Sequence, residues 1–336
     1  MSSSQPRVAI VGATGAVGTE LISCLEQRRF PLGELRLFAS ERSAGRSLPY
    51  KGTALPVEPL TESAFAAVDI ALFSAGASRS RQFAPAAVAA GAIVIDNSSA
   101  FRMDSDVPLV VPEVNVEAMR AHRGVIANPN CVAIIAVMPL WPLHRQFGLR
   151  RIIAATYQAA SGAGAAAMEE LRQSTRAALS DQPFTPRVLR HPYAFNLFSH
   201  DTAVDPLSGS NEEETKVARE LCKIMQTPDL RVSVTCIRVP VLRAHAIALS
   251  AEFERPILPQ QARELLAQSP GIRIVDDTAR NHFPMPIEAT GQGDVLVGRI
   301  RRDSSDPSGH SISLFIAGDQ LLKGAALNAV QIAERL

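Results

Sequence analysis

Short apolar runs alternate with segments of helical periodicity in the first part of the chain. The run Arg7–Val11 is largely apolar, and three further runs of this kind are Leu35–Ala39, Val68–Ser74 and Ala92–Asp96. Segments with the apolar spacing of a helix, such as Arg79–Ala90, lie between them. Strands that alternate with helices pair in parallel, because each helix crosses back over the sheet. The pattern therefore predicts an α/β fold with a doubly wound, Rossmann-type sheet in this region.

The pattern changes after Cys131. Strand-like segments follow one another with fewer helices between them, namely Arg151–Tyr157, Arg231–Val239, Ala246–Glu254, Val295–Arg302 and Ser311–Ala317. This order predicts a mixed sheet built partly from hairpins. Two stretches rich in Pro and Ser, 181–186 and 303–310, are expected to be loops, and 319–336 is expected to be a helix. With 336 residues the chain exceeds one ordinary core, so two domains are expected.

Composition narrows the function classes. The chain is 46% apolar and 20% charged with a net charge of +1, which is typical of a soluble globular enzyme. Aromatic residues make up 5% and no basic block occurs, so no nucleic-acid partner is expected. The start has no apolar leader, and the longest apolar run, Cys131–Trp141, is too short to cross a bilayer. A cytoplasmic protein with no membrane partner is expected. The spacing of the 4 cysteines and 7 histidines indicates no metal site.

Three glycines follow the first predicted strand, in the order Gly12-x-x-Gly15-x-x-Gly18. Glycine at such positions allows a tight turn, lets the backbone approach a pyrophosphate, and brings the next helix close to the strand. The phosphates then lie at the N-terminus of that helix, where N–H groups are unpaired. The pattern favours a dinucleotide site, with a tight structural turn as the alternative. Its candidate residues are Gly12, Thr14, Gly15, Ala16, Val17 and Gly18.

The end of the second predicted strand bears on the choice of dinucleotide. An acidic residue there is typical of NAD sites, whereas an arginine accommodates the 2′-phosphate of NADP. The chain continues as Ser40-Glu41-Arg42-Ser43, in which Arg42 offers a fork of donors and the serines offer hydroxyls. Glu41 argues for NAD, and Arg42 would be a solvated loop charge if no phosphate binds there. Taken together, the segment favours NADP.

Cys131 stands in the sequence Asn128-Pro129-Asn130-Cys131, directly before an apolar run. The residue before a proline is disfavoured in a helix and Asn130 is a good N-cap, so a helix is expected to begin at the cysteine. Unpaired N–H groups and the helix dipole at this position favour a thiolate, which attacks carbonyl carbons. Backbone donors close by would hold the resulting oxyanion. The alternative is a buried cysteine that packs as a small apolar residue.

Further motifs are distributed along nearly the whole chain, from Val8 to Ile332. Beside the segments already described they are Asp96–Arg102, Pro112–Asn115, Tyr157–Gly164, Asn196–His200, Glu212–Lys216, Arg238–Val241 with His245, and Gly318–Ala326. Each motif alone is unspecific, but in this order they are highly specific. The chain resembles the aspartate-β-semialdehyde dehydrogenase family, in particular its plant and cyanobacterial branch.

The resemblance implies the reaction of that family, in which NADPH reduces L-4-aspartyl phosphate to L-aspartate 4-semialdehyde and phosphate is released. The step belongs to the biosynthesis of lysine, threonine and methionine. Residues 1–129 and 318–336 would form the NADP-binding domain, and 130–317 the catalytic and dimerisation domain. The implied assembly is a homodimer, with a tetramer as the alternative.

The resemblance also implies a role for each matching residue. Cys131 would be the nucleophile that forms an acyl-thioester, with His245 as acid/base partner and Gln158 beside the reacting carbonyl. The other matches are Arg102 and Lys216 for phosphate, Arg238 for the substrate carboxylate, Glu213 for its amine, Asn130 for the substrate, and Gly76, Ser161, Gly162 and Gln320 for the cofactor. Without the resemblance, His245 is an ordinary strand histidine and 212–216 a charged helix face.

Two departures from the family pattern and two rival functions complete the expectations. The family commonly has Cys-Ser-Thr where this chain has Cys131-Val132-Ala133, which removes two hydroxyls at the helix start. Ile247 stands where many members of the branch have Glu. One rival is an N-acetyl-γ-glutamyl-phosphate reductase, whose acetylated substrate amine needs no acid, so Glu213 argues against it. The other is a non-catalytic nucleotide-binding paralogue, against which the joint presence of the matched polar residues argues.

Overall fold

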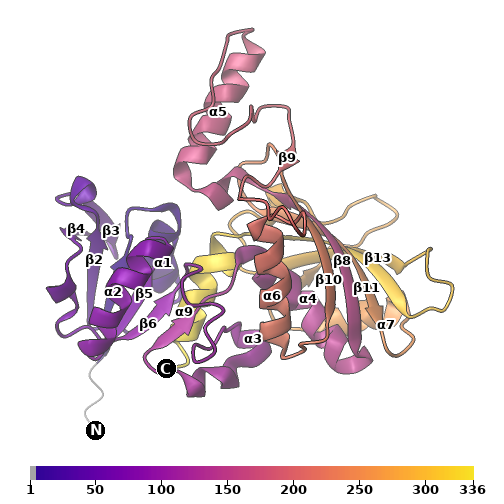
Figure 1. Cartoon of the computed structure of the whole chain (residues 1–336), viewed down its shortest axis with the longest axis horizontal. Helices are drawn as coiled ribbons and strands as arrows, with labels where there is room; N and C mark the ends of the chain where they lie inside the picture. Colours follow the sequence, from indigo (N-terminus) through magenta and orange to yellow (C-terminus); the bar gives the residue numbers. More distant parts are fainter. Residues whose placement is uncertain (1–4) are drawn as a thin grey trace. The chain divides into compact units, whose positions relative to one another are not determined.

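The computed structural model describes residues 5–336, and residues 1–4, part of the N-terminal segment in which no apolar leader was expected, lie outside the described part. The chain divides into two compact units (Figure 1). The first contains the residues up to Asn130 together with Ala325–Leu336, and the second is Cys131–Gly324. Within the described residues, no helix is both long and apolar enough to cross a membrane.

The first unit is built on a seven-stranded sheet in the order β3-β4-β2-β1-β5-β6-β7. Every pair of neighbouring strands is parallel except β3 and β4. The predicted Rossmann-type α/β sheet is therefore confirmed. Its strands are β1 (Arg7–Val11), β2 (Glu34–Ala39), β3 (Ser47–Tyr50), β4 (Thr53–Pro59), β5 (Ile70–Phe73), β6 (Ile93–Asp96) and β7 (Val125–Ala127). Its helices are α1 (Ala16–Gln27), α2 (Ala77–Ala89), α3 (Pro112–Asn115) and α9 (Leu327–Ala333).

Helix α9 belongs to the first unit although it lies at the end of the chain. It packs against α1 and β6, and its Ala329, Val330 and Ile332 are fully buried. Just beyond the two helices, Arg28 donates two hydrogen bonds of 2.6 Å to the carboxylate of Glu334. Apolar burial and this ion pair hold the C-terminal segment on the N-terminal sheet.

The hairpin of β3 and β4 was not predicted from the sequence. Its turn is Lys51-Gly52, and both residues have positive φ, 48° and 77°. Two such residues form the tight turn whose twist matches antiparallel strands. Prolines at positions 49, 56 and 59 hide the strand pattern, and the sheet tolerates them because the hairpin lies at its edge.

The second unit contains a mixed seven-stranded sheet in the order β12-β13-β14-β11-β8-β10-β9, as the sequence predicts for this region. Its strands are β8 (Leu149–Gln158), β9 (Phe198–Ser199), β10 (Arg231–Arg238), β11 (His245–Phe253), β12 (Ile272–Ile274), β13 (Val295–Arg302) and β14 (Ser311–Gly318). Its helices are α4 (Cys131–Phe147), α5 (Ala165–Leu179), α6 (Glu212–Met225), α7 (Pro259–Ala267) and α8 (Pro286–Ala289).

Three helices cover one face of this second sheet. Helix α4 packs on β8, β11, β13 and β14, while α6 packs on β10 and α7 on β12 and β13 (Figure 1). Helix α5 stands away from the sheet and, with the loop that follows it, forms an arm over 160–200. The arm has a small core of its own, made of Ala160, Ala167, Leu171, Leu189 and Tyr193.

The predicted helix over 319–336 is wrong in its first part. Residues 319–321 form a turn, Leu322–Ala326 is a single π-helical turn, and the α-helix begins only at Leu327. The carboxylate of Asp319 accepts the N–H groups of Leu321 and Leu322, at 2.9 and 3.3 Å. These bonds stabilise a turn at a place where the apolar periodicity alone indicates a helix.

Candidate active site

The glycine loop lies between β1 and α1. Gly12 has φ +87°, and a Cβ atom there would approach the carbonyl oxygen of Ser74 to 2.4 Å. A Cβ at Gly18 would lie 2.2 Å from the carbonyl oxygen of Gly12, so helix and loop touch through glycine. Gly15 is the N-cap of α1 and supplies no side-chain oxygen to the N–H groups of the first turn, which include Ala16 and Val17. Such a turn fits an anionic group.

The other candidate cofactor residues of this unit follow neighbouring strands. Ser40, Arg42 and Ser43 come directly after β2, where Glu41–Ser43 forms a 3₁₀ turn with exposed Glu41 and Arg42 side chains. Gly76 follows β5 and is the N-cap of α2, with φ +87°. Because β2, β1 and β5 are adjacent and parallel, their C-terminal ends lie along one edge of the sheet. That edge is where open α/β sheets bind dinucleotides.

Arg102 lies at the same end of the first unit, close to the segment that leads to Cys131. It is buried, and its guanidinium donates from Nε to the carbonyl of Asn128 (3.0 Å) and from Nη2 to the carbonyl of Asn97 (2.7 Å). The side chain of Asn128 is held in turn by Asn328, whose Nδ2 lies 2.7 Å from Asn128 Oδ1. The arginine is thus fixed to the backbone two residues before buried Asn130, which ends the unit.

Candidate residues of the second unit lie where four strands end or begin. Gln158 ends β8 and is in register with Arg238, which ends the parallel strand β10. His245 begins the antiparallel strand β11, opposite Gly318 at the end of β14. Ser161 and Gly162 follow β8 in a 3₁₀ turn, and Gln320 follows β14. The sheet register therefore brings residues far apart in sequence to one end.

Cys131 is the first residue of α4, as the proline-containing segment predicts. A Cβ atom on Gly324 would lie 2.9 Å from Cβ of Cys131 and 3.2 Å from Cβ of Gln320. The glycine thus allows the turn after β14 to pack closely against the helix start. Gln320 reaches further, because its Oε1 accepts the N–H of Ala244 at 3.0 Å and its Nε2 donates to the hydroxyl of Ser161. Through these contacts Cys131 and His245 share one neighbourhood.

The imidazole of His245 is fully buried and its tautomer is fixed by the backbone. The N–H of Ala159 donates to Nδ1 at 2.9 Å, so the neutral ring carries its proton on Nε2. Nε2 has no hydrogen-bond partner among the described residues. Burial, and the positive charges of Arg238 and His200, lower the pKa of His245 well below its ordinary value. The ring is therefore a neutral donor at physiological pH.

A second buried donor points to the same place. Arg238 is 5% exposed, and its Nη1 likewise has no hydrogen-bond partner in the part of the chain that the structure describes. A Cβ atom on Gly162 would lie 3.1 Å from both Arg238 Nη1 and His245 Nε2. A glycine at this position leaves room beside two donors that a polar ligand would satisfy. Buried donors without partners are costly, so such a pair is a mark of a binding site.

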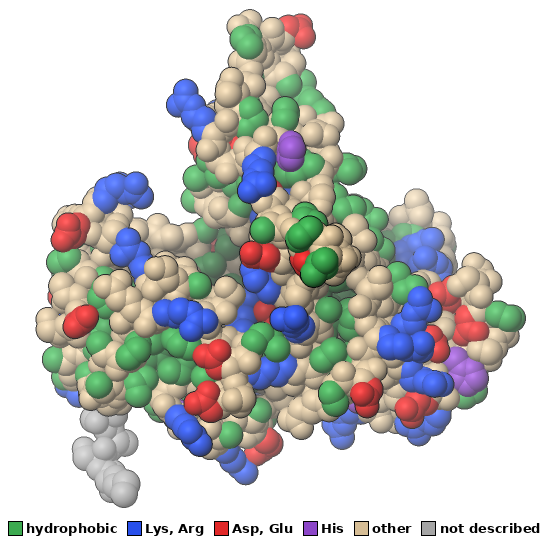
Figure 2. Space-filling model, in the orientation of Figure 1, with side chains coloured by type: hydrophobic (Ala, Val, Ile, Leu, Met, Phe, Trp, Pro, Cys, Tyr) green, Lys and Arg blue, Asp and Glu red, His purple; other side chains and the backbone are tan. Residues whose placement is uncertain are grey.

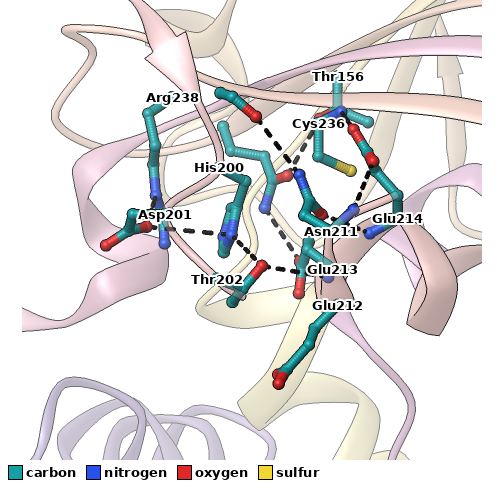
Figure 3. A network of polar contacts seen from close by, with 12 residues as sticks. Thr156, His200, Asp201, Thr202, Asn211, Glu212, Glu213, Glu214, Cys236 and Arg238 are labelled. Atoms are coloured by element: carbon teal, nitrogen blue, oxygen red, sulfur yellow. Dashed lines mark hydrogen bonds and ion pairs between the residues drawn. The ribbon is translucent and has the colours of Figure 1, made fainter. Parts of the chain in front are cut away.

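Helix α6 carries Glu213, the candidate acid of the site. Asn211 and Glu214 form a capping box at its start, with both bonds at 2.9 Å, and Glu214 also accepts the N–H of Cys236 on β10 at 3.0 Å. This fixes the first turn so that Glu213 points into the network of labelled residues (Figure 3). Its Oε1 accepts Nε2 of Gln158 at 3.1 Å.

Lys216 and Glu212 lie away from these inward contacts. They form an i,i+4 ion pair of 3.3 Å, in which the lysine side chain is 31% exposed. Figure 3 shows Glu212 directed away from the network formed by the other labelled residues.

Several polar residues of this network were not singled out from the sequence. Asp201 lies with Oδ1 3.3 Å from Nε of Arg238, and His200 lies 3.9 Å from the same oxygen (Figure 3). Burial and the charge of Arg238 lower the pKa of His200. The hydroxyl of Thr156 donates to Oε1 of Gln158 at 3.0 Å. Their nearest sequence signal was the motif Asn196–His200, which the pairing of β9 with Arg238 places beside the site.

The arrangement has the groups for acyl chemistry without a metal ligand set. Within residues 5–336 no group of three His, Cys, Asp or Glu side chains has the geometry of a metal site. A cysteine at a helix start, a neutral imidazole donor and buried cations together suit a nucleophile, an oxyanion and anionic substrate groups.

Comparisons with known proteins found two family models that match the chain. Residues 7–122 match the family model of the semialdehyde dehydrogenase NAD binding domain, and 140–323 match that of the semialdehyde dehydrogenase dimerisation domain. The chain is 51% identical to an aspartate-semialdehyde dehydrogenase of Synechocystis over 98% of its length and 97% of that protein. An enzyme of the same name from Aquifex aeolicus is 47% identical, with 98% and 97% covered.

Solved structures give the same result. The crystal structure of aspartate semialdehyde dehydrogenase II from Vibrio cholerae, complexed with ASA, superimposes with a TM-score of 0.96 at 42% identity. The match covers 99% of this chain and 98% of that one. The family resemblance predicted from the motifs is confirmed, and cyanobacterial proteins are among the relatives.

Proposed function

The chain belongs to the aspartate-semialdehyde dehydrogenase family, and we propose that it reduces L-4-aspartyl phosphate to L-aspartate 4-semialdehyde with NADPH, reversibly. It is an oxidoreductase with a dinucleotide-binding domain. The observation that carries the proposal is that Cys131, His245 and Arg238 lie at one end of the second sheet. Two buried donors there, His245 Nε2 and Arg238 Nη1, have no hydrogen-bond partner among the described residues.

The cofactor proposal rests on the first unit. The nicotinamide, when bound, supplies the hydride, and the residues of this chain hold and orient the dinucleotide. Gly12 and Gly18 let the loop pass close to a pyrophosphate, which the uncapped start of α1 would bind. Arg42, exposed after β2, would pair with the 2′-phosphate and select NADP over NAD.

Catalysis is proposed to proceed through a thioester on Cys131. The thiolate attacks the acyl carbon of aspartyl phosphate, a C–S bond forms, and the carbonyl electron pair moves to oxygen. The Nε2–H of His245 donates to this oxygen, and the C–O bond to phosphate then breaks as the carbonyl re-forms. Because Ala159 holds Nδ1 as an acceptor, His245 acts as a donor to oxygen and does not remove the thiol proton. The helix start favours the thiolate instead.

The remaining residues are assigned by pairing each charged group of the substrate with a side chain of opposite charge. Arg238 would bind the substrate carboxylate through its inward-facing Nη1, and Glu213 would bind the ammonium group. Arg102 and Lys216 would bind phosphate. Gln158 would exchange its present bond to Glu213 for one to the substrate.

An assay with two aldehydes tests this function. Purified protein should reduce NADP in a phosphate-dependent reaction with aspartate semialdehyde and should be far slower with N-acetylglutamate semialdehyde. Cys131→Ala should abolish the reaction, because a missing nucleophile typically costs several orders of magnitude. The opposite substrate preference would favour an N-acetyl-γ-glutamyl-phosphate reductase. Nucleotide binding without turnover of either aldehyde would favour a non-catalytic paralogue.

The second unit is also proposed to form a homodimer. The face of its sheet opposite α4, α6 and α7 bears Ile153, which is 45% exposed, and the packed rings of Tyr157 and Phe315. The matched family model is that of a dimerisation domain. Sedimentation should show a dimer that Ile153→Arg dissociates. Leu179→Arg on α5, a position that is 72% exposed, is the control. Figure 2 shows hydrophobic side chains on the surface of the arm as well. A monomer or a tetramer of the unchanged protein would contradict this assembly.

A further inference from the structure

Ala244, which directly precedes His245, has a left-handed backbone. Its φ is +71°, and the residue is fully buried. For a residue with a Cβ atom this conformation is unfavourable, because the Cβ lies too close to the following carbonyl oxygen. It persists only where the surrounding structure holds it. Because the backbone of Ala244 sets the direction in which β11 begins, whatever holds Ala244 also sets the position of the His245 ring.

Two consecutive residues after β14 hold this segment. Gln320 accepts the N–H of Ala244 at 3.0 Å through Oε1. Asp319 accepts Nε of Arg243 at 2.7 Å through Oδ2. Residues 319 and 320 therefore bind residues 243 and 244 side by side, and we call these two contacts the clamp.

Asp319 is the rigid part of the clamp. Its side chain is 0% exposed, and beside Arg243 it accepts the N–H groups of Gly291 at 2.7 Å and Leu321 at 2.9 Å. A buried carboxylate with this many donors has one arrangement that satisfies it. The bond to Leu321 also fixes the backbone on the far side of Gln320, so Asp319 orients its neighbour's side chain as well.

We propose that Asp319 is a positioning residue for the reaction, which acts through Arg243 and Gln320 to hold Ala244 in its left-handed conformation. His245 Nε2 then faces the point beside Gly162 at which the oxyanion forms. The inference rests on the proposed function, since it assigns His245 as the oxyanion donor. Nothing in it requires Asp319 to touch substrate or cofactor.

Another buried ion pair of the same unit, which shares no bond with the clamp, provides the control. The side chain of Asp276 is 2% exposed, pairs with Arg263 at 2.6 Å, and accepts the N–H of Arg299 at 2.9 Å. Arg263 and Arg243 are similarly exposed, with 32% and 24% of their side chains accessible. Asp276→Asn thus weakens a buried ion pair and a backbone hydrogen bond in the same unit, and leaves both contacts of the clamp in place.

Asp319→Asn should lower kcat at least tenfold while the KM for phosphate changes less than about twofold, and Asp276→Asn should leave kcat unchanged at a similar loss of Tm. If Asp319→Asn does not fold, the kcat of Arg243→Ala is compared with that of Arg263→Ala in the same way. Equal losses of kcat within each pair, or full activity of both clamp variants, would overturn the proposal.

Hydrogen exchange tests the clamp without any turnover. The amide of Ala244 should exchange at least tenfold faster in Asp319→Asn than in Asp276→Asn, because its bond to Gln320 is released. Unchanged exchange would overturn the proposal. If the unmodified protein turned over no semialdehyde, the proposed function would fail while the exchange experiment still decided whether the clamp exists.

Discussion

Glu170 fastens the arm of the second unit, and its removal should loosen that arm alone. The residue lies on α5 and is 5% exposed. Its Oε2 accepts the N–H groups of Arg187 and Val188 at 2.6 and 2.7 Å, and its Oε1 accepts that of Leu189 at 3.0 Å. One carboxylate thereby holds the three successive amides of the loop that covers the small arm core.

The loss of stability follows from the number of hydrogen bonds that the side chain can still accept in Glu170→Gln. A carboxamide has one acceptor oxygen, so its NH₂ group must face at least one of the three N–H donors. Hydrogen bonds to a charged group contribute about 1.5–3 kcal/mol each, and an N–H left unpaired in a buried site costs about 1–3 kcal/mol. The variant should therefore destabilise the arm by at least about 1.5 kcal/mol, which is roughly tenfold in its local opening equilibrium.

Hydrogen exchange of the amides of Arg187, Val188 and Leu189 measures this opening. We expect exchange at least tenfold faster in Glu170→Gln, with the sheet amides of β8 unchanged. Glu169→Gln is the matched control, because Glu169 is the preceding residue of the same helix and is half exposed. Its carboxylate contacts two side chains of its own helix, Arg172 at 3.7 Å and Nε2 of Gln173 at 3.1 Å, and so does not hold the loop. Equal exchange in both variants would refute the reasoning.

The same bond set predicts a pH dependence. Burial raises the pKa of the Glu170 carboxyl, but the N–H groups of Leu189, Arg187 and Val188 outweigh it, and the net shift is downward. A carboxyl with a lowered folded pKa stabilises fully above its unfolded pKa of about 4.3 and loses this stabilisation as the pH falls through the folded value. The protection of the loop amides, taken relative to their intrinsic exchange rate at each pH, should thus fall only below about pH 4.3.

Three further predictions concern the site. Arg42→Ala should weaken NADPH binding by about 1.5–3 kcal/mol in calorimetry and leave NADH binding nearly unchanged, and equal losses would show that it does not contact the 2′-phosphate. Arg238→Lys should raise the semialdehyde KM about tenfold, or about 1.4 kcal/mol, because the planar fork is lost, whereas a change in the phosphate KM alone would contradict its assignment. His245→Asn should lower kcat at least ~100-fold but leave the pH profile of Cys131 alkylation unchanged, and a raised thiol pKa would identify the imidazole as the base.

Much of the fold was predictable because the burial pattern is regular. The buried parallel strands of the first unit are continuous apolar runs, and the start of α4 at Cys131 follows from local proline and N-cap preferences. The β3–β4 hairpin was missed because its prolines break the pattern that strands usually show. The helix predicted over 319–336 is too long because Asp319 accepts the N–H groups of Leu321 and Leu322 in a turn. Its carboxylate is fixed in turn by Arg243 and Gly291, which are distant in sequence.

The residues of the candidate site likewise divide into those with a local sequence signal and those without one. Cys131 and the glycine loop have local signals, since each depends on the backbone next to it. His245, Arg238 and Gln158 have none, because only the register of β8, β10 and β11 brings them together. The tautomer of His245 depends on the N–H of Ala159, which is 86 residues away. A contact of that kind follows from tertiary packing and has no counterpart in spacing or composition.

Trapping the acyl-enzyme tests the central claim most directly. The purified protein is mixed with aspartate semialdehyde and NADP in the absence of phosphate, so that the thioester forms but has no acceptor. We expect a rapid burst of about one NADPH per active site, and mass spectrometry of the quenched protein should find an aspartyl group on the peptide that contains Cys131. A burst with no adduct on that peptide, or an adduct that persists in Cys131→Ala, would contradict the account.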